Sequence, residues 1–463
     1  MERPNAWKSY SDEQISSLNE LADNYTRFIS ENKTERECVA TAAQMAKEAG
    51  YIDLDQAIAS GKNLVAGDKI MAVNHGKTLL LVEVGTESFE SGLNILGAHV
   101  DSPRIDIKQN PLEENSDIAY LDTHYYGGIK KYQWVTMPLA IHGVIAKKDG
   151  SVVDVRVGDN PGDPVFCISD ILPHLGRAQA EKKMGEAVEG ENLDLIVGSR
   201  PAKVEEDEKQ DRLVAKTVLD ILKKQYDVEE EDFLSAELEI VPAGDARDCG
   251  FDRSMIVGYG HDDRSCSYPS LLAQLEVVAP RRCAVCLLVD KEEIGSVGAT
   301  GMTSKFFENS MAEILELAGE SGDLKLRRCL KNSFMLSSDV SACFDPLFAA
   351  QFEKKNSCFM GRGLAFNKYT GSRGKGGSND ADAEYVAKIR SIMDQRDVKF
   401  QTAELGRVDA GGGGTIAYIL AKYDMCVIDC GVGVLSMHSP WEIISKADLF
   451  EAYRGYKAFL DLA

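Results

Sequence analysis

The chain has 463 residues, which is long enough for two or three domains with a sizeable hydrophobic core. Hydrophobic residues make up 44% of it and charged residues 27%, a composition typical of globular proteins. Its 52 Lys and Arg residues against 74 Asp and Glu residues give a formal net charge of -22. We expect no general affinity for nucleic acid or for anionic membranes, because both require a basic surface.

No apolar run reaches the roughly 18 residues that a membrane-spanning helix needs, and the N-terminal segment lacks the apolar stretch of a signal peptide. The 11 cysteines are scattered between Cys38 and Cys430, which fits a reducing compartment better than a disulfide framework. Cys283 and Cys286 match a CxxC spacing, but they lie in a predicted strand, where residues three apart face opposite sides. These features predict a cytoplasmic protein.

The first hundred residues contain two predicted helices followed by predicted strands. Capping boxes at Ser11 and Thr34 each predict the start of a helix. Runs rich in β-branched and apolar residues at 69–85 and 93–99 then predict strands of a central sheet.

The pattern of predicted elements changes between about residues 107 and 252, where short strands and Gly and Pro turns precede an amphipathic helix. That helix has Val214, Val218 and Leu222 on one face. We interpret 107–252 as an inserted β-rich α+β domain. It divides a discontinuous domain made of residues 1–106 and 253–463.

Strands and helices alternate from residue 265 onward. The pattern predicts a helix that opens near Pro269 and, after it, elements at 283–289, 303–317, 333–338 and 380–394. Such alternation implies right-handed crossovers and a mostly parallel sheet with helices on both faces. The predicted fold class is therefore α/β, with a mostly parallel sheet flanked by helices and interrupted by the inserted domain.

Several side chains that bind metals in other proteins follow predicted strands of this sheet. In open α/β sheets, ligands collect beyond the carboxyl ends of the strands, so such side chains can converge although they are distant in sequence. These candidate residues are His99, Asp101, Asp262, Asp263, Glu292, Glu293, Asp339 and His438.

Glu292 and Glu293 are expected to divide two roles between them. Adjacent residues in extended chain point in opposite directions, so one can bind a metal while its neighbour meets a water molecule. The carboxylates of Asp262, Glu293 and Asp339 with one hydroxide carry four negative charges, which balance two Zn²⁺ ions held also by two neutral histidines. Metal binding lowers the pKa of water from ~15.7 towards ~7. Glu292 would then take and deliver the proton.

These motifs resemble those of the aspartyl aminopeptidase family of zinc exopeptidases. The resemblance covers nearly the whole chain, in order and with a similar insertion. It rests on GAHVDSPR at 97–104, GHDDR at 260–264, DKEEIGS at 290–296, SDVS at 338–341 and SMHSP at 436–440. It implies a zinc exopeptidase-like fold and an aminopeptidase that removes one N-terminal residue, by preference Asp or Glu, from peptides.

The resemblance also implies a role for each candidate residue. One zinc ion would be held by His99 and Asp339, a second by Glu293 and His438, with Asp262 as the bridge, Glu292 as general base and Asp101 orienting His99. A cis peptide bond is expected between Asp262 and Asp263. From the residue types alone, Co²⁺ and Mn²⁺ are as acceptable as Zn²⁺ at such a site.

An oligomeric active site is a further implication of the resemblance. His142, in the segment 137–142, would reach the active site of a neighbouring subunit and help bind the substrate carbonyl. The inserted domain would make the contacts of a tetrahedral homododecamer. Without the resemblance, His142 is an ordinary strand histidine.

Substrate preference is indicated by a basic segment. Residues 354–375 contain six basic residues and no acidic one, in a protein of net charge -22, so they could attract an acidic side chain. The alternative is an exposed basic loop. The resemblance favours Lys368 as the partner of the substrate carboxylate. Better-known members of the family carry histidines soon after the residue that matches Asp339, whereas this chain has Ala342-Cys343-Phe344, which alters the pocket wall.

Two other functions stay open at this point. A metal-dependent deacylase or carboxypeptidase on the same fold would bind a substrate carboxylate, in place of a free amine, near the metals. A non-catalytic peptide-binding scaffold would keep the fold without turnover, although Glu292 and all five proposed ligands are present. Assays that compare Asp- and Glu-p-nitroanilide with N-acylated amino acids separate the two enzymatic functions.

Overall fold

The computed structural model describes residues 3–203 and 211–463, and the chain divides into two compact units. The first unit comprises the chain up to Ser102, Ala246–Met437 and Glu442–Ala463, and the second comprises Pro103–Asp245 and His438–Trp441. The sequence placed the boundaries at 106/107 and 252/253. It did not anticipate that the chain returns to the second unit at His438.

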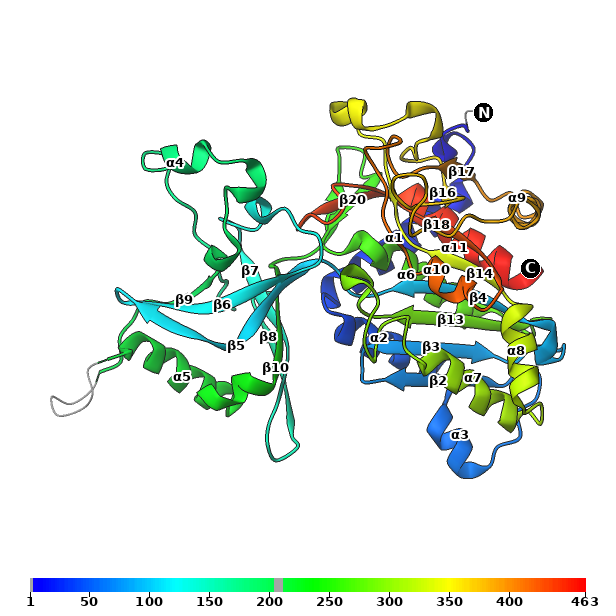
Figure 1. Cartoon of the computed structure of the whole chain (residues 1–463), viewed down its shortest axis with the longest axis horizontal. Helices are drawn as coiled ribbons and strands as arrows, with labels where there is room; N and C mark the ends of the chain where they lie inside the picture. The colour runs from blue at the N-terminus through cyan, green and yellow to red at the C-terminus, as the bar shows by residue number, and fades with distance from the viewer. Residues whose placement is uncertain (1–2, 204–210) are drawn as a thin grey trace. The chain divides into compact units, whose positions relative to one another are not determined.

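A mostly parallel sheet lies at the centre of the first unit (Figure 1). Among the described residues its strands are, in spatial order, β1 (Ile52–Asp53), β2 (Lys69–Asn74), β3 (Thr78–Glu83), β13 (Cys283–Val289), β4 (Leu93–His99), β14 (Phe334–Ser338), β18 (Cys426–Gly431), β16 (Leu364–Asn367) and β17 (Phe400–Ala403). β4 pairs in parallel with β13 on one side and with β14 on the other. Antiparallel pairs join β2 with β3, β3 with β13, and β16 with β18. The predicted fold class is confirmed.

Helices cover both faces of this sheet. They are α1 (Asp12–Glu31), α2 (Glu35–Glu48), α3 (Leu54–Ser60), α6 (His261–Glu276), α7 (Phe306–Leu317), α8 (Asp323–Lys331), α9 (Ala383–Gln395), α10 (Ala417–Ala421) and α11 (Lys446–Leu462). The capping boxes at Ser11 and Thr34 are both present, as predicted. The helix predicted to open at Pro269 instead contains this proline, and its regular part follows Asp262 and Asp263, whose backbone angles are not helical.

Alternate residues of β13 pack into different hydrophobic clusters. Cys286 and Leu288 join the cluster that includes α1, α2, α6, α9 and α11, whereas Cys283 and Leu287 join the one that includes α3, α7, α8 and α10. This alternation with a period of two is the expected geometry of a strand that is covered on both sides. It separates the two cysteines of the CxxC spacing, so they are core residues, as predicted.

The first unit also contains a second, smaller sheet. Its strands are β11 (Arg247–Cys249), β12 (Met255–Gly258), β20 (Glu442–Ser445), β19 (Gly433–Leu435) and β15 (Ser341–Ala342). The short 3-10 helices of the chain are η1 (Ala6–Lys8), η2 (Phe89–Ser91), η3 (Lys131–Gln133), η4 (Met184–Glu186), η5 (Gly190–Asn192), η6 (Glu230–Ser235), η7 (Glu292–Ile294), η8 (Pro346–Gln351) and η9 (Lys354–Asn356). Every helix among the described residues is too short or too polar to cross a lipid bilayer.

The second unit is built on an antiparallel sheet with one long helix. The sheet consists of β8 (Val152–Val157), β7 (Leu139–Ala146), β10 (Ala236–Pro242), β5 (Arg104–Asn115), β6 (Ile118–Tyr126) and β9 (Leu195–Gly198). The helix α5 (Leu213–Tyr226) contacts β5, β6 and β9, and α4 (Arg177–Ala180) is a single turn. The amphipathic helix predicted from Val214 and Leu222 is therefore present.

Candidate metal centre

Side chains that follow three parallel strands meet at one edge of the central sheet. His99 is the last residue of β4 and lies opposite Val289, the last residue of β13. Asp339 directly follows β14 on the other side of β4. Because the carboxyl ends of parallel strands lie at the same edge, the side chains of these strands converge there.

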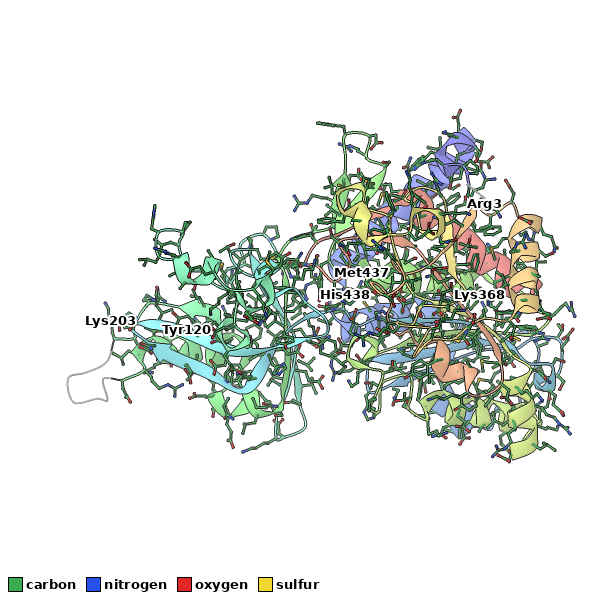
Figure 2. The ribbon with its side chains drawn as sticks, turned by 45° about the horizontal axis from the view of Figure 1, so that its top comes forward. Arg3, Tyr120, Lys203, Lys368, Met437 and His438 are labelled. Atoms are coloured by element: carbon green, nitrogen blue, oxygen red, sulfur yellow. The ribbon has the colours of Figure 1, made fainter. Side chains whose placement is uncertain are left out.

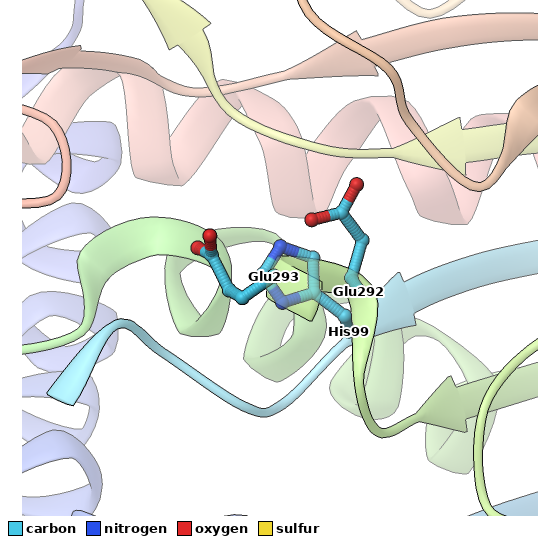
Figure 3. Close-up of side chains that lie close together, drawn as sticks. All are labelled: His99, Glu292 and Glu293. Carbon is cyan, nitrogen blue, oxygen red and sulfur yellow. The ribbon is translucent and has the colours of Figure 1, made fainter. Parts of the chain in front are cut away.

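Glu292 and Glu293 do not point in opposite directions, as residues of extended chain would, because a carboxylate oxygen of each lies within 4.8 Å of the other. They begin the 3-10 helix η7, whereas the sequence suggested extended chain. Successive residues of a 3-10 helix are rotated by about 120° because it has three residues per turn. Figure 3 shows the two carboxylates on either side of the His99 imidazole.

Two sets of ligand atoms in the first unit are close enough to share a metal ion. Atoms of His99, Asp262 and Asp339 lie within 4.8 Å of one another, and all three side chains are buried. Atoms of His99, Glu292 and Glu293 also lie within 4.8 Å of one another. Both sets combine imidazole nitrogen with carboxylate oxygen, which are donors that zinc accepts. The donor chemistry therefore fits a divalent metal, with His99 common to both sets.

The carboxylate of Asp101 lies on the Nδ1 side of the His99 imidazole. The Asp101 side chain is completely buried, and its Oδ1 atom lies 3.3 Å from Nδ1 of His99. The backbone carbonyl oxygen of Asp101 lies nearer to the same nitrogen, at 3.0 Å. The other ring nitrogen, Nε2, lies 3.2 Å from Oδ1 of Asp262. A carboxylate on one ring nitrogen fixes the ring so that the other nitrogen can bind a metal.

Burial and like charge govern the protonation of this cluster. Burial alone would lower the pKa of His99, but the hydrogen bonds to Asp101 and Asp262 outweigh it and hold that pKa well above its usual range. Burial, together with the negative charges of Asp263 and Glu292, raises the pKa of Asp339 well above its usual range. Such a group of buried carboxylates favours positive charge among them, whether a proton or a divalent cation.

The turn at Asp262 is held by groups that the sequence did not single out. Ser102 donates a hydrogen bond from its hydroxyl to the carbonyl oxygen of Asp262 at 2.7 Å, and the backbone N–H of Asp262 donates to Glu442 at 3.0 Å. The predicted cis peptide bond between Asp262 and Asp263 is present. Ser102 could have been suspected from its place in the motif of His99, whereas nothing in the sequence marks Glu442.

His438 lies in the part of the chain that belongs to the second unit. Its Nδ1 atom is 3.1 Å from the carbonyl oxygen of Gly128 in that unit. The neighbouring residue Met437 belongs to the first unit, so the peptide bond between them marks the boundary. The role of His438 as a metal ligand stays a prediction.

His142 lies within the antiparallel sheet of the second unit. It is in β7, fully buried, and its Nε2 atom is 2.8 Å from a carboxylate oxygen of Asp159. The structure therefore shows His142 in contact with a residue of its own unit. The contribution of His142 to a neighbouring subunit stays a prediction.

The basic segment does not form one positive pocket. Lys368 and Lys375 both pair with the carboxylate of Asp380, at 2.7 Å and 2.9 Å, so a neighbouring acidic residue partly neutralises them. Asp380 lies outside the range 354–375 whose composition suggested a pocket, which is why the sequence pattern missed it. The role of Lys368 in substrate binding also stays a prediction.

A buried cluster of histidine and carboxylates at the carboxyl edge of a mostly parallel α/β sheet is typical of the metal site of an α/β metalloenzyme. The model of the family described as Aminopeptidase I zinc metalloprotease (M18) matches residues 28–460. A Clostridium acetobutylicum protein described as a probable M18 family aminopeptidase 1 is 57% identical over 460 residues, which cover 99% of this chain and 98% of that protein. The chain belongs to the M18 family of aminopeptidases, which are zinc metalloproteases.

Solved structures share this fold. The M18 family aminopeptidase of Thermotoga maritima is 42% identical and matches with a TM-score of 0.94 over 100% of both chains. Aminopeptidase I of Clostridium acetobutylicum is 53% identical in the structural alignment, with a TM-score of 0.93 over 99% of both chains. An S. cerevesiae mApe1 dodecamer matches with a TM-score of 0.74 over 96% of this chain and 97% of that one, and at 20% identity it shows the fold alone.

Proposed function

We propose that this aminopeptidase uses two zinc ions per subunit and removes acidic N-terminal residues from peptides. The observation that carries the proposal is the buried group of His99, Asp262 and Asp339, whose ligand atoms lie within 4.8 Å of one another. One ion would be held by His99 and Asp339 and the other by Glu293 and His438. Asp262 would bridge the two ions.

The chemistry divides between the metals and the protein. When bound, the two zinc ions would polarise the scissile carbonyl and lower the pKa of a water molecule shared between them. Glu292 is half-buried and lies beside His99, which supports a role as the general base. Its carboxylate would accept the proton of that water and deliver it to the leaving amine. Asp101 keeps the His99 ring oriented through Nδ1.

Direct assay tests the reaction. Asp-, Glu-, Leu- and Lys-p-nitroanilides are compared by kcat/KM, alongside N-acetylated amino acids and peptides blocked at the N-terminus. The proposal requires that the two acidic substrates be preferred and that blocked substrates be inert. Turnover of the N-acetylated compounds would indicate a deacylase or carboxypeptidase instead. Zinc content near two ions per subunit, measured on the same preparation, tests the dinuclear centre.

In this proposal, Lys368 binds the acidic side chain of the substrate. Lys375 provides a matched control for its substitution. Both ammonium groups contact Asp380, so Lys368→Gln and Lys375→Gln remove the same charge from the same carboxylate. Lys368→Gln should raise KM for the Glu substrate by about 10- to 100-fold, since a charge-assisted hydrogen bond contributes about 1.5–3 kcal/mol. KM for the Leu substrate should stay unchanged. Equal effects of the two substitutions would remove Lys368 from its role.

An oligomeric assembly, with the tetrahedral homododecamer as its form, is part of the proposal. It is supported by the family membership and by the dodecamer of the structural relative mApe1. Sedimentation of the purified protein tests it. Mixed assemblies of Glu292→Gln and His142→Ala subunits test whether His142 acts in a neighbouring active site. If it does, the mixture is more active than either parent, because intact Glu292 then meets an intact His142 from another subunit.

A cytoplasmic location is proposed on the state of the cysteines. All 11 cysteines have free thiols, and most of them are buried. Unpaired thiols are typical of proteins in reducing compartments. Fractionation of cells that express the protein checks this location.

A further inference from the structure

A cavity outside the candidate metal centre lies at the edge of the central sheet in the first unit. It has a volume of about 800 Å³ and is bordered by the edge strand β17, the helix α9 and the 3-10 helix η9. Five of its lining residues are basic, and one is acidic. The basic residues are Arg3, Lys354, Lys355, Arg362 and Arg390.

Five basic residues against one acidic residue leave the lining of this cavity with an excess of four positive charges. The carboxylate of Glu353 is engaged in the local turn, where it accepts hydrogen bonds from the backbone N–H of Lys355 at 3.2 Å and from the side chain of Asn356 at 2.6 Å. Among the described residues, Lys354, Lys355 and Arg390 form no ion pair with any carboxylate. This contrasts with Lys368, which is paired with Asp380.

Aromatic rings hold two of the guanidinium groups in place. The guanidinium of Arg3 lies 4.2 Å from the ring centre of Phe400, and that of Arg362 lies 4.3 Å from the ring centre of Phe359. Stacking on an aromatic face fixes the plane of a guanidinium group, whose N–H donors point outward along its edge. The groups are therefore positioned before any ligand binds.

The cavity is separate from the metal centre. Two strands, β18 and β16, lie between β14, which precedes Asp339, and β17, which borders the cavity. At ~4.8 Å between neighbouring strands, that separation is about 14 Å. Figure 2 labels Arg3, which lines the cavity, and Lys368, which does not, at different places in the first unit. None of the candidate metal ligands lines the cavity.

We propose that this cavity binds a small phosphate-bearing metabolite with at least two phosphate groups. Guanidinium groups match phosphate oxygens in a two-point geometry, and three are present beside two lysines. The volume lies in the range of small-molecule sites, ~300–1,000 Å³. In a protein of net charge -22, five basic residues around one cavity repel each other and create a local field that selects anions. This inference is independent of the proposed substrate.

Calorimetric titration of the zinc-loaded protein tests the proposal. The probe is fructose 1,6-bisphosphate, with fructose and succinate as neutral and dicarboxylate comparisons, all at one ionic strength. The test variant is Lys355→Gln/Arg390→Gln, in which both residues are exposed. The matched control is Lys47→Gln/Lys224→Gln, which removes two exposed lysines outside the cavity and gives the same net charge.

The expected result is saturable binding of the bisphosphate to the wild type and the control, and affinity at least 10-fold lower in the test variant. Zinc content should be the same in all three proteins. Absence of binding to the wild type at millimolar concentration would overturn the proposal. Equal affinity of the test and control variants would place the anion elsewhere, for example at the metals. Equal binding of succinate would overturn the assignment to phosphate.

Discussion

The carboxylate of Asp101 accepts a hydrogen bond from the backbone N–H of Glu292, with 3.1 Å between Oδ1 and the nitrogen. Its second oxygen accepts the N–H of Glu293 at 3.2 Å. The same buried carboxylate contacts His99. Asp101 therefore links the histidine of the candidate centre to the turn that carries both glutamates, so it fixes ligands from two strands at once.

Replacing Asp101 should loosen this link. Asp101→Asn retains one acceptor oxygen but puts an amide donor against a backbone N–H. We expect zinc affinity to fall by about 10- to 100-fold, as is typical when a partner of a metal ligand is lost. Competition with a chelating dye measures this affinity. A zinc affinity equal to that of the wild type would show that Asp101 does not position the ligands.

The two adjacent glutamates should respond differently to the same substitution. Glu292→Gln should keep the zinc content and lower kcat by about 10²- to 10⁴-fold, the range attributed to general bases. Glu293→Gln should lower zinc content as well, because it removes a proposed ligand. Metal analysis and steady-state kinetics on both variants check this. Wild-type turnover in Glu292→Gln would exclude it as the base.

Removal of metal should reduce stability as well as activity. Asp262, Asp263 and Asp339 are buried near one another, and a divalent cation would compensate their charge. We expect chelator-treated protein to lose activity and unfold at a lower temperature, since a ligand of the folded state stabilises it. Added zinc should restore both. A melting temperature that is insensitive to zinc would contradict metal binding at these carboxylates.

Asp429 should make stability depend on pH. Burial raises the pKa of this carboxyl to about 7, and the hydrogen bond from Thr415 at 2.6 Å offsets only part of that effect. Because the folded pKa lies above the unfolded value, the folded state binds the proton more tightly between pH ~4 and pH ~7. The stabilisation is therefore present at low pH and is lost as pH rises through about 7.

The variant Asp429→Asn should lack this loss. The difference in free energy of unfolding between this variant and the wild type should grow between pH ~4 and pH ~7, by at most about 1.4 kcal/mol per pH unit. Above pH ~7 the difference should stay constant. Urea unfolding from pH 5 to pH 8 measures the difference. Asp424→Asn, an exposed change in the turn before the same strand, is the control and should follow the wild type. Parallel profiles for all three proteins would refute the prediction.

Much of the fold followed from local patterns in the sequence. Capping boxes gave the starts of α1 and α2, and the alternation of strands and helices gave the class of the sheet. The position of His99 was also predictable, because β4 is buried along its whole length and its apolar run ends there. These predictions worked because each depends on a few adjacent residues.

The features that could not be predicted from the sequence depend on contacts between residues that are far apart along the chain. The pairing of Lys368 with Asp380 could not be inferred from a count of basic residues between 354 and 375. The contact of Glu442 with the backbone of Asp262 crosses 180 positions of the chain. The start of α6 was placed too late, because Pro269 is tolerated inside a helix that begins with an irregular turn.

The discontinuous first unit has a consequence for synthesis. His99 leaves the ribosome before the inserted second unit, whereas Asp262, Glu293 and Asp339 are translated after it. A nascent chain that ends before Asp339 therefore lacks one member of the buried set of His99, Asp262 and Asp339. The complete cluster can therefore form only after the chain on both sides of the inserted unit has been synthesised.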